Sequence, residues 1–571
     1  MNRLLSRLSS RLTALAAIGL GLCCAAPAQA AAPGITGPAF ALTAHDGWIN
    51  QPDGSQVYTW GVGCTVGAVA PSFVPAAIGG ANCPQMQIPS PTLVVTEGQT
   101  VTVTLTNLLP PPAGNTSLLF PGFQVTGVAA ATQPATCSNT AAPVSQGLLT
   151  MEVANGCAIT YTFTATSPGT RAYYSGTQGD LQVEMGMYGA VIVMPSSINA
   201  ACSGGYSASN NMARAHWGEG EFRLPNATGG VGAAYDHAKT CYDREYLFQF
   251  SEMDSNIHRA ALAQVTALGS CKAGSAGCSL EVPTEPYHPG YFMINGRSMP
   301  DDMDGNYASP YPNQPYNGNP HMHPGELVLL RVIGQGRWQH PFHEHANHVR
   351  ILARDGNLIL ANDGTPLPSN NLAGPLMFTT TTTPGLAFDG LFYYTGRGLN
   401  WDMYGHHSGS DTDTLATLPC TADVNGYNTG DPTALNYFEW CQDHNKPLEA
   451  APLGDVAGGG PATLPNPNIF TNGAWYGGTP YLGPDATLRA GTPGCATGQT
   501  ILTAAAGTNP TPNCSPLQPS NIQGNPANER GYAFMWHSHN EREITTNNVF
   551  PGGMFMMMLV DSREFRIDES N

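Results

Sequence analysis

Several short stretches of the chain alternate polar and apolar residues with a period of two, which is the pattern of a β-strand with one buried face. The clearest examples are residues 99–106 (QTVTVTLT) and 158–164 (AITYTFT). An apolar run at 187–194 (MYGAVIVM), which Pro195 ends, suits a central strand. We therefore predict that residues 40–196 form one Greek-key β-sandwich domain.

A second group of strand patterns follows a Gly/Ser/Asn-rich linker at 197–240. These patterns begin near residue 245, include the run GELVLLRV at 325–332, and end with residues 532–537 and 554–560. Residues of about 408–528 are rich in Gly, Pro, Asn and Thr and contain four cysteines. We interpret 241–571 as a second, C-terminal domain interrupted by this long, disulfide-stapled insertion. The fold class predicted for the whole chain is all-β.

The composition agrees with a turn-rich β protein. Only 11% of the 571 residues are charged, and Gly and Pro together number 114; an average domain has about 25% charged residues. The net charge of −18 is unsuited to binding the phosphate backbone of nucleic acid.

The first 30 residues have the pattern of a secretory signal peptide. Three arginines precede an apolar run at 12–26, and Ala28-Gln29-Ala30 supplies small residues for cleavage. No later apolar run is long enough to span a membrane. We therefore expect an exported protein that is periplasmic or secreted.

Cysteine usage also indicates an oxidising compartment. An even number of cysteines, twelve, follows the predicted signal peptide. Pairing each with its neighbour in sequence would give six local loops, among them Cys64 with Cys83 and Cys137 with Cys157. None of the twelve lies beside a histidine motif, so we predict that all of them are structural.

Two His-x-His triplets carry most of the chemical information. His343-Glu344-His345 lies within HPFHEH at 340–345, and His537-Ser538-His539 follows Trp536. Residues i and i+2 of a strand project from the same face, so two such strands side by side would bring four imidazoles together. Neutral imidazole binds Cu, Zn, Fe and Ni. Eight of the 16 histidines lie in 321–348 and 537–539, which favours a metal site over scattered core or surface histidines.

These motifs resemble the multicopper oxidases, whose last cupredoxin domain carries an HPxHxH segment and a later HCHxxxHxxxxM segment. Residues 340–345 match the first segment, and His537 and His539 match part of the second. The resemblance implies copper as the cofactor, two cupredoxin-like domains, and metal ligands at His343, His345, His537 and His539. It also assigns His340 to a mononuclear blue (type 1) copper site. In that site, Ser538 stands where the family has cysteine and Glu543 stands where it has histidine.

The first domain resembles the same family through Pro91-Thr92, Glu97-Gly98 and the strand that follows. Where the family has S-I-H-W-H-G, this chain has SLLFPG at 117–122, and where it has Y-H-S-H, this chain has YYSG at 173–176. The four ligand histidines of the first domain are therefore replaced. Four histidines cannot build the family's eight-histidine cluster unless a neighbouring subunit supplies the rest.

Other residues near the motifs have two interpretations each. His321, His323, His406 and His407 are further local donors, although an exposed loop is the favoured interpretation for 321–323. His340 either binds metal or is a hydrogen-bonded structural histidine. Met554, Met556 and Met558 suit Cu(I) or, more commonly, core packing. Glu541 and Glu543 either orient metal-bound histidines or relay protons, or lie in a solvated loop; Glu344 should face away from the metal.

Three functions are consistent with this sequence. The first is a copper-dependent oxidoreductase that acts with oxygen on a small reducing substrate or metal ion. The second is a copper-binding or sequestration protein without turnover, and the third is a structural cupredoxin scaffold. Zinc is an alternative occupant of a four-imidazole site. The sequence identifies no catalytic residue beyond the metal ligands.

Overall fold

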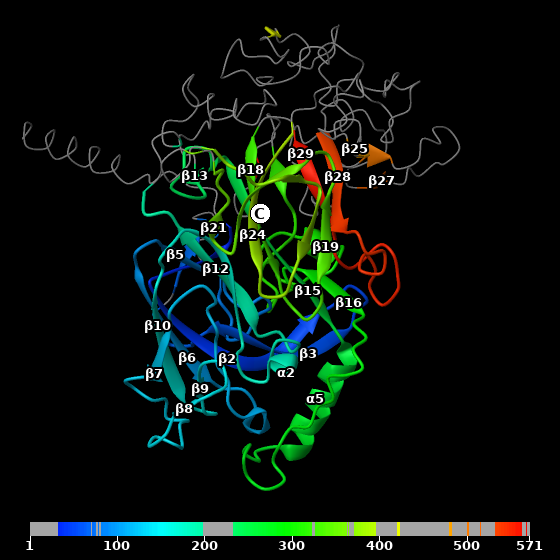
Figure 1. Ribbon diagram of the computed structural model, residues 1–571. Helices are drawn as coiled ribbons and strands as arrows, with labels where there is room; N and C mark the ends of the chain where they lie inside the picture. The colour runs from blue at the N-terminus through cyan, green and yellow to red at the C-terminus, as the bar shows by residue number, and fades with distance from the viewer. Residues whose placement is uncertain are drawn as a thin grey trace, which may run out of the picture.

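The computed structural model describes residues 32–197, 232–394 and 531–561, apart from 70, 76–77, 79–81, 323–325, 363 and 365–370, together with short pieces elsewhere. These residues form two β-sandwiches, drawn in blue to cyan and in green to red in Figure 1. The predicted all-β fold class, with two sandwich domains and disulfide-linked loops, is confirmed. The predicted signal peptide, most of the linker and most of the insertion lie outside the described residues.

Two five-stranded sheets make the first sandwich. One has the order β11-β12-β5-β1-β4 and the other β3-β2-β6-β10-β7. The strands are β1 (Gly34–Thr36), β2 (Ala39–Asn50), β3 (Gln56–Cys64), β4 (Ser72–Val74), β5 (Leu93–Thr96), β6 (Thr100–Asn107), β7 (Thr126–Ala129), β10 (Ala158–Thr164), β11 (Gly169–Tyr174) and β12 (Tyr188–Met194). A separate hairpin joins β8 (Val144–Gln146) and β9 (Met151–Val153), and η2 (Pro111–Ala113) and α2 (Gly179–Gln182) lie in loops.

Alternation along β6 explains how this sandwich closes. Val101, Val103 and Leu105 are fully buried between the sheets. Strand β10 pairs with β6 in antiparallel register, placing Tyr161 opposite Val103. The predicted strands at 99–106, 158–164 and 187–194 are therefore confirmed to within one residue.

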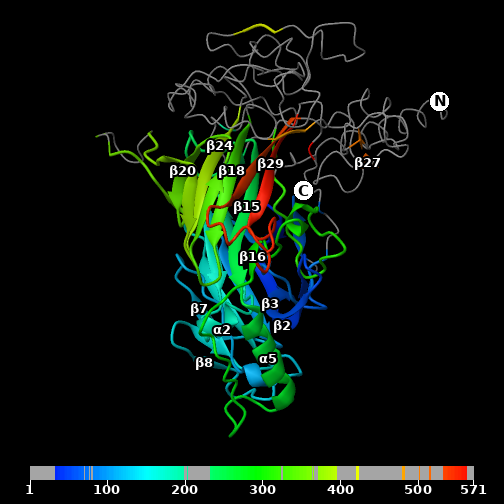
Figure 2. The same ribbon diagram turned by 90° about the vertical axis from the view of Figure 1, so that its right-hand side faces the viewer.

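The second sandwich has a seven-stranded and a six-stranded sheet. Figure 2 shows β20, β24, β18 and β15 side by side in the first of these. Its strands are β15 (Arg244–Met253), β16 (Tyr291–Ile294), β18 (Leu327–Gly334), β20 (Val349–Arg354), β21 (Asn357–Leu358), β22 (Leu376–Met377) and β24 (Ala387–Tyr393). The six-stranded sheet contains β17 (His321–Met322), β19 (His340–Glu344), β23 (Thr379–Thr382), β25 (Thr479–Tyr481), β28 (Gly531–Ser538) and β29 (Phe555–Asp561). The short strands β13 (Gly232–Ala233) and β14 (Cys241–Tyr242) pair with each other, as do β26 (Thr500–Ile501) and β27 (Cys514–Ser515), and η3 (Asp301–Met303) follows β16.

One helix and one buried charge network join the two sandwiches. Helix α5 (Ser255–Leu268) begins at Asp254, whose carboxylate accepts a hydrogen bond from the backbone N–H of Asn256. Its buried residues Ile257 and Ala261 belong to the core of the first sandwich. The charge network centres on Arg331 in β18. Its buried guanidinium forms an ion pair with Glu245 at 2.8 Å and donates a hydrogen bond to the hydroxyl of Thr170 in β11 at 3.1 Å.

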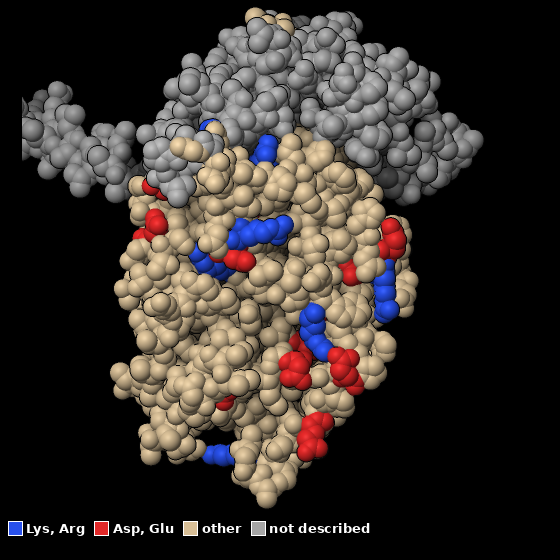
Figure 3. All heavy atoms as spheres, in the orientation of Figure 1, with Lys and Arg blue, Asp and Glu red and all other residues tan. Residues whose placement is uncertain are grey.

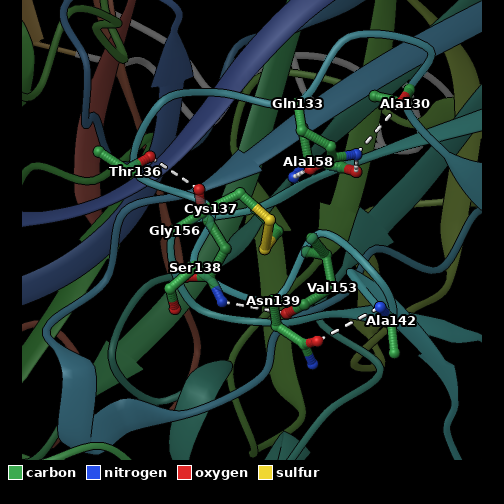
Figure 4. Close-up of a disulfide and its surroundings, with 12 residues drawn as sticks. Ala130, Gln133, Thr136, Cys137, Ser138, Asn139, Ala142, Val153, Gly156 and Ala158 are labelled. Carbon is green, nitrogen blue, oxygen red and sulfur yellow. Dashed lines mark hydrogen bonds between the residues drawn. A yellow bond between two sulfur atoms is a disulfide. The ribbon is translucent and has the colours of Figure 1, made fainter.

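Four disulfides confirm the predicted pairing of sequence neighbours where the structure describes both partners. They join Cys64 to Cys83, Cys137 to Cys157, Cys202 to Cys241 and Cys271 to Cys278. Figure 4 shows the second of these, beside the hydrogen bond from the Thr136 hydroxyl to the Gly156 carbonyl. Cys420 is also disulfide-bonded. The pairing of the remaining four cysteines, Cys420 included, stays a prediction.

The described surface carries few charges, as the low charged fraction predicts. Figure 3 shows a few blue and red side chains, several of them in contact with each other, separated by wide uncharged areas on the face it presents. Within the described residues, no helix combines the length and apolarity that crossing a membrane requires.

Candidate metal centre

Strands β19 and β28 bring the two His-x-His triplets together. They pair in antiparallel register, with His343 directly opposite His537 and Phe342 opposite Ser538. Phe342 and Trp536 point into the apolar core of the second sandwich. Because neighbouring residues of a strand face opposite sides, the alternate positions 343, 345, 537 and 539 share the outer face of the sheet.

All four imidazoles converge on that face. The ligand nitrogens of His343, His345 and His537 lie within 4.8 Å of one another, and the Nε2 atoms of His345 and His537 are 3.3 Å apart. The ring centres of His343 and His539 are 4.8 Å apart. His537 is buried, His343 and His345 are half-buried, and His539 is exposed, so the cluster has a protected side and an open side.

The environment of the cluster favours neutral imidazoles. Burial, followed by the positive charge that neighbouring histidines would carry, lowers the pKa of His343 to about 4 and that of His345 to about 4. Burial also lowers the pKa of His537. Neutral imidazole is the form that binds a metal ion, so these three histidines need to release few protons when a metal ion binds at pH 7.

Hydrogen bonds to the Nδ1 atoms leave Nε2 available on two of the rings. His343 Nδ1 lies 2.6 Å from the hydroxyl of Thr379 in β23. His537 Nδ1 lies 2.6 Å from the carbonyl oxygen of Ser538. A carbonyl can only accept, so His537 Nδ1 carries the proton and its Nε2 presents a lone pair. Such partners fix the tautomer and orientation of a metal-binding histidine.

His340 occupies a different environment, on the opposite side of β19. Its Nδ1 lies 2.9 Å from Glu543 Oε2, and its Nε2 lies 2.9 Å from Glu252 Oε2. Burial alone would lower the pKa of this imidazole, but the hydrogen bonds and charges of the two carboxylates outweigh that effect and raise the pKa to about 9. His340 is thus held between two carboxylates, and both ring nitrogens are occupied.

The other candidates have mixed outcomes. The expected exposed loop at 321–323 is wrong for His321 and Met322, which are buried in β17 because that strand pairs with β29. His323, His406 and His407 lie outside the described residues. Core packing is confirmed for Met554, Met556 and Met558.

The acidic residues near the motifs also differ in their environments. Glu541 is exposed, whereas Glu543 is buried beside His340. Glu344 points away from the cluster into the interior, as predicted; neither of its carboxylate oxygens has a hydrogen-bond partner, and burial raises its pKa well above the usual range.

Sequence reasoning missed two residues of this region. Thr379 lies within a run of five threonines, which gives no sign of which hydroxyl meets His343. Glu252 lies near the end of β15, after the largely apolar residues 246–250, and an acidic residue at such a position was a usable signal. Both partners are far from the histidine motifs in sequence, so spacing alone could not connect them.

The open side of the cluster is bordered by aromatic side chains. Phe378, which is 52% exposed, meets the ring of His343 edge-on at 5.7 Å and that of His348 at 5.0 Å. Phe550, which is 62% exposed, lies 6.5 Å from Phe555, whose ring centre is 6.4 Å from that of His537. An incoming molecule would therefore meet apolar surface around the histidines.

Comparison with known families identifies part of the chain. The family model described as "Multicopper oxidase" matches residues 83–197. Those residues, which cover most of the first sandwich from β5 onwards, are similar to a multicopper oxidase domain. The resemblance found in the sequence is thereby confirmed, and copper is the metal that the family implies. No curated protein matches the chain in sequence.

Solved structures of copper proteins are similar to this chain, but with low TM-scores and low sequence identity. The multicopper oxidase mgLAC has 13% identity and a TM-score of 0.41 over 93% of this chain and 87% of that one. A blue copper oxidase from Nitrosomonas europaea has 14% identity and a TM-score of 0.40 over 91% and 85%. A copper nitrite reductase from Nitrosomonas europaea has 17% identity and a TM-score of 0.33 over 63% and 85%. Similarities at this level support no conclusion about the chemistry of this chain.

The segment 83–197, which matches the family model, contains no histidine. Its two motif-like segments do meet, because Leu119 and Tyr174 form a β-bridge with N···O distances of 2.7 and 3.3 Å. A Cβ atom on Gly176 would lie 2.9 Å from the side chain of Leu119. Leucine, tyrosine and glycine thus occupy positions where the resemblance implies ligands, so these positions offer no imidazole to a metal ion.

Proposed function

We propose that this protein is a copper-dependent oxidoreductase that uses dioxygen, with copper held by His343, His345, His537 and His539. The observation that carries the proposal is the convergence of four imidazoles from two paired strands, with the pKa values of His343 and His345 lowered to about 4. The donor set fits copper, for which imidazole nitrogen is a preferred ligand. The multicopper oxidase domain within the same chain supports copper over zinc.

The protein's own part in this chemistry is to hold the ligands and to leave one side open. Copper held by these four histidines would supply one-electron redox chemistry between a reductant and dioxygen. Thr379 and the Ser538 carbonyl fix the rings of His343 and His537 through Nδ1. Exposed His539 and the aromatic border formed by Phe378 and Phe550 leave the reductant a direct approach.

We also propose that the protein acts outside the cytoplasm, in the periplasm or after secretion. The pattern of residues 1–30 supports this location. The four disulfides support it as well, because such bonds persist in oxidising compartments.

The test combines copper content with oxygen uptake. The full chain is loaded with copper, dialysed, and given a phenol, a diamine, Mn(II) or Fe(II) as reductant. We expect retained copper, oxygen uptake with at least one reductant, and loss of both in His343→Ala. Leu119→Ala, at the corresponding segment of the first sandwich, is the control and should retain both. If copper is retained but none of the reductants supports oxygen uptake, the oxidase assignment is contradicted.

One observation favours a second function, copper binding without turnover. The absence of histidine from 83–197 leaves, among the described residues, the four imidazoles of the cluster, which can hold one copper ion or two bridged ions. Copper that is retained without oxygen uptake would identify a carrier. About three ions per chain would instead mean that a second copy of the chain contributes ligands, and the oligomeric state would then depend on copper.

A further inference from the structure

A second cluster lies directly behind the histidine centre, where the sequence resemblance implies a mononuclear copper site. It contains His340, Ser538 and Glu543, at the three positions where the family has histidine, cysteine and histidine. The structure brings these three side chains into contact although 203 residues separate His340 from Glu543. The cluster is fully buried.

One carboxylate oxygen sits at the centre of the cluster. Glu543 Oε2 lies 2.9 Å from His340 Nδ1 and accepts a hydrogen bond of 2.5 Å from the Ser538 hydroxyl. The two side chains that would point at a metal ion therefore both point at this oxygen. Its partner oxygen, Oε1, accepts a hydrogen bond from the side chain of Asn540 at 2.8 Å.

The residues present do not fit a blue copper ion. Such a site takes a thiolate and two imidazoles, whereas here a hydroxyl and a carboxylate replace the thiolate and one imidazole. The remaining imidazole has no free nitrogen, because Glu252 Oε2 lies 2.9 Å from His340 Nε2. A metal ion would have to displace a carboxylate from a buried charge pair, which leaves uncompensated charge in the interior.

The surrounding backbone holds this arrangement in place. Glu252 Oε1 accepts hydrogen bonds from the backbone N–H groups of Arg337 and Trp338 at 2.6 and 2.9 Å. The backbone N–H of Met554 donates to the carbonyl of Glu543, and the N–H of Ser538 donates to the carbonyl of Met554. The carboxylates are therefore fixed from both sides before any ion could arrive.

We propose that the Glu252–His340–Glu543 triad is a metal-free replacement for the second metal centre, with Glu543 Oε2 in the position of the ion. The triad ties strand β19 to β15 and to the loop after β28. Ser538, which donates to Glu543, lies between two of the cluster histidines, so the triad also positions β28 beneath the cluster. This inference does not depend on whether the histidine cluster turns over substrate.

A functional consequence follows for electron entry. With no metal at the triad, the described residues offer no second redox centre next to the histidine cluster. A reductant must then deliver its electrons at the cluster itself, on the side bordered by Phe378 and Phe550. Reductants too large to reach that side should be poor substrates.

Reconstruction of the ion site tests the proposal. In a His343→Ala/His539→Ala background, which disables the histidine cluster, we expect no tightly bound copper. Adding Ser538→Cys with Glu543→His should create a site for one copper ion with the intense visible absorption of a copper–thiolate bond. Ser538→Cys with Glu541→His is the matched control; residue 541 is exposed, so that pair should give no such band.

Two results would overturn the proposal. The first is one tightly held copper in the His343→Ala/His539→Ala background that Glu543→Gln removes, which would show that the triad itself binds metal. The second is a Ser538→Cys/Glu543→His variant that melts cooperatively but shows no thiolate band on copper addition. If that variant does not fold, the comparison of Glu543 with Glu543→Gln in the His343→Ala/His539→Ala background decides alone. The proposal is supported if neither protein retains copper.

Discussion

The two sandwiches contain the same structural feature, a pair of neighbouring segments, but fill it differently. In the second sandwich His343 lies opposite His537, and four imidazoles share one face. In the first, Leu119 lies opposite Tyr174, and Gly176 leaves no room for a side chain. Two neighbouring backbone segments are therefore present in both places, while imidazole side chains that could bind a metal ion lie on only one of them. Metal-binding capacity in this chain depends on side chains and not on the fold.

The largest expected effect comes from removing ligands on one side of this comparison. His343→Ala/His539→Ala should abolish copper retention because half of the cluster's imidazoles are lost. The matched pair Leu119→Ala/Tyr174→Ala removes the residues at the corresponding place in the first sandwich and should leave copper affinity unchanged. Competition titration against a chelator of known affinity measures both. Equal losses in the two variants would mean that the first sandwich takes part in the site.

A core substitution in the first sandwich should lower stability and leave copper binding unchanged. Leu118 is fully buried in the core of the first sandwich, so Leu118→Ala should lower the free energy of unfolding by about 2–5 kcal/mol. Copper per folded chain should not change. Denaturant unfolding followed by metal analysis separates the two quantities, and a fall in copper per folded chain would contradict the separation of roles.

The triad should make stability depend on pH at the alkaline end. The pKa of His340 is raised to about 9 from 6.5, so its stabilising charge is fully present below pH 6.5 and is lost as the pH rises through 9. The shift corresponds to about 3 kcal/mol of unfolding free energy. His340→Gln should flatten the profile between pH 6.5 and 9, measured by urea unfolding. An equally steep profile in that variant would assign the effect to another group.

The smallest effect is expected from the hydroxyl that orients His343. Thr379→Val removes the hydrogen bond to Nδ1 with little change of shape, and copper affinity should fall by about 10- to 100-fold. Thr381→Val is the control, because Thr381 is an exposed residue on the same face of β23. If both variants bind copper equally well, the hydrogen bond does not orient the ligand.

Much of this organisation follows from local sequence patterns. Period-two alternation located β6 and β10, and the spacing of His343 and His345 placed both imidazoles on one face before any strand pairing was known. The sequence also showed that Ser538 stands where the multicopper oxidases have cysteine. What could not be predicted was where the partners of these residues come from.

Long-range pairing explains the remainder. Glu252 and Thr379 reach His340 and His343 from strands 88 and 36 residues away. The sequence left Glu543 undecided between a solvated loop and an active role, because burial at that position depends on how the loop after β28 folds back. Helix α5 was missed because its apolar face is narrow and packs against the other sandwich.

Copper per chain, with an electron paramagnetic resonance spectrum of the same dialysed sample, tests the central claim most directly. The four-histidine centre predicts one or two ions per chain, nitrogen couplings from imidazole ligands, and loss of both in His343→Ala/His539→Ala. No retained copper, or a nitrogen-coupled signal that persists unchanged in that double variant, would contradict the claim that strands β19 and β28 build the metal centre.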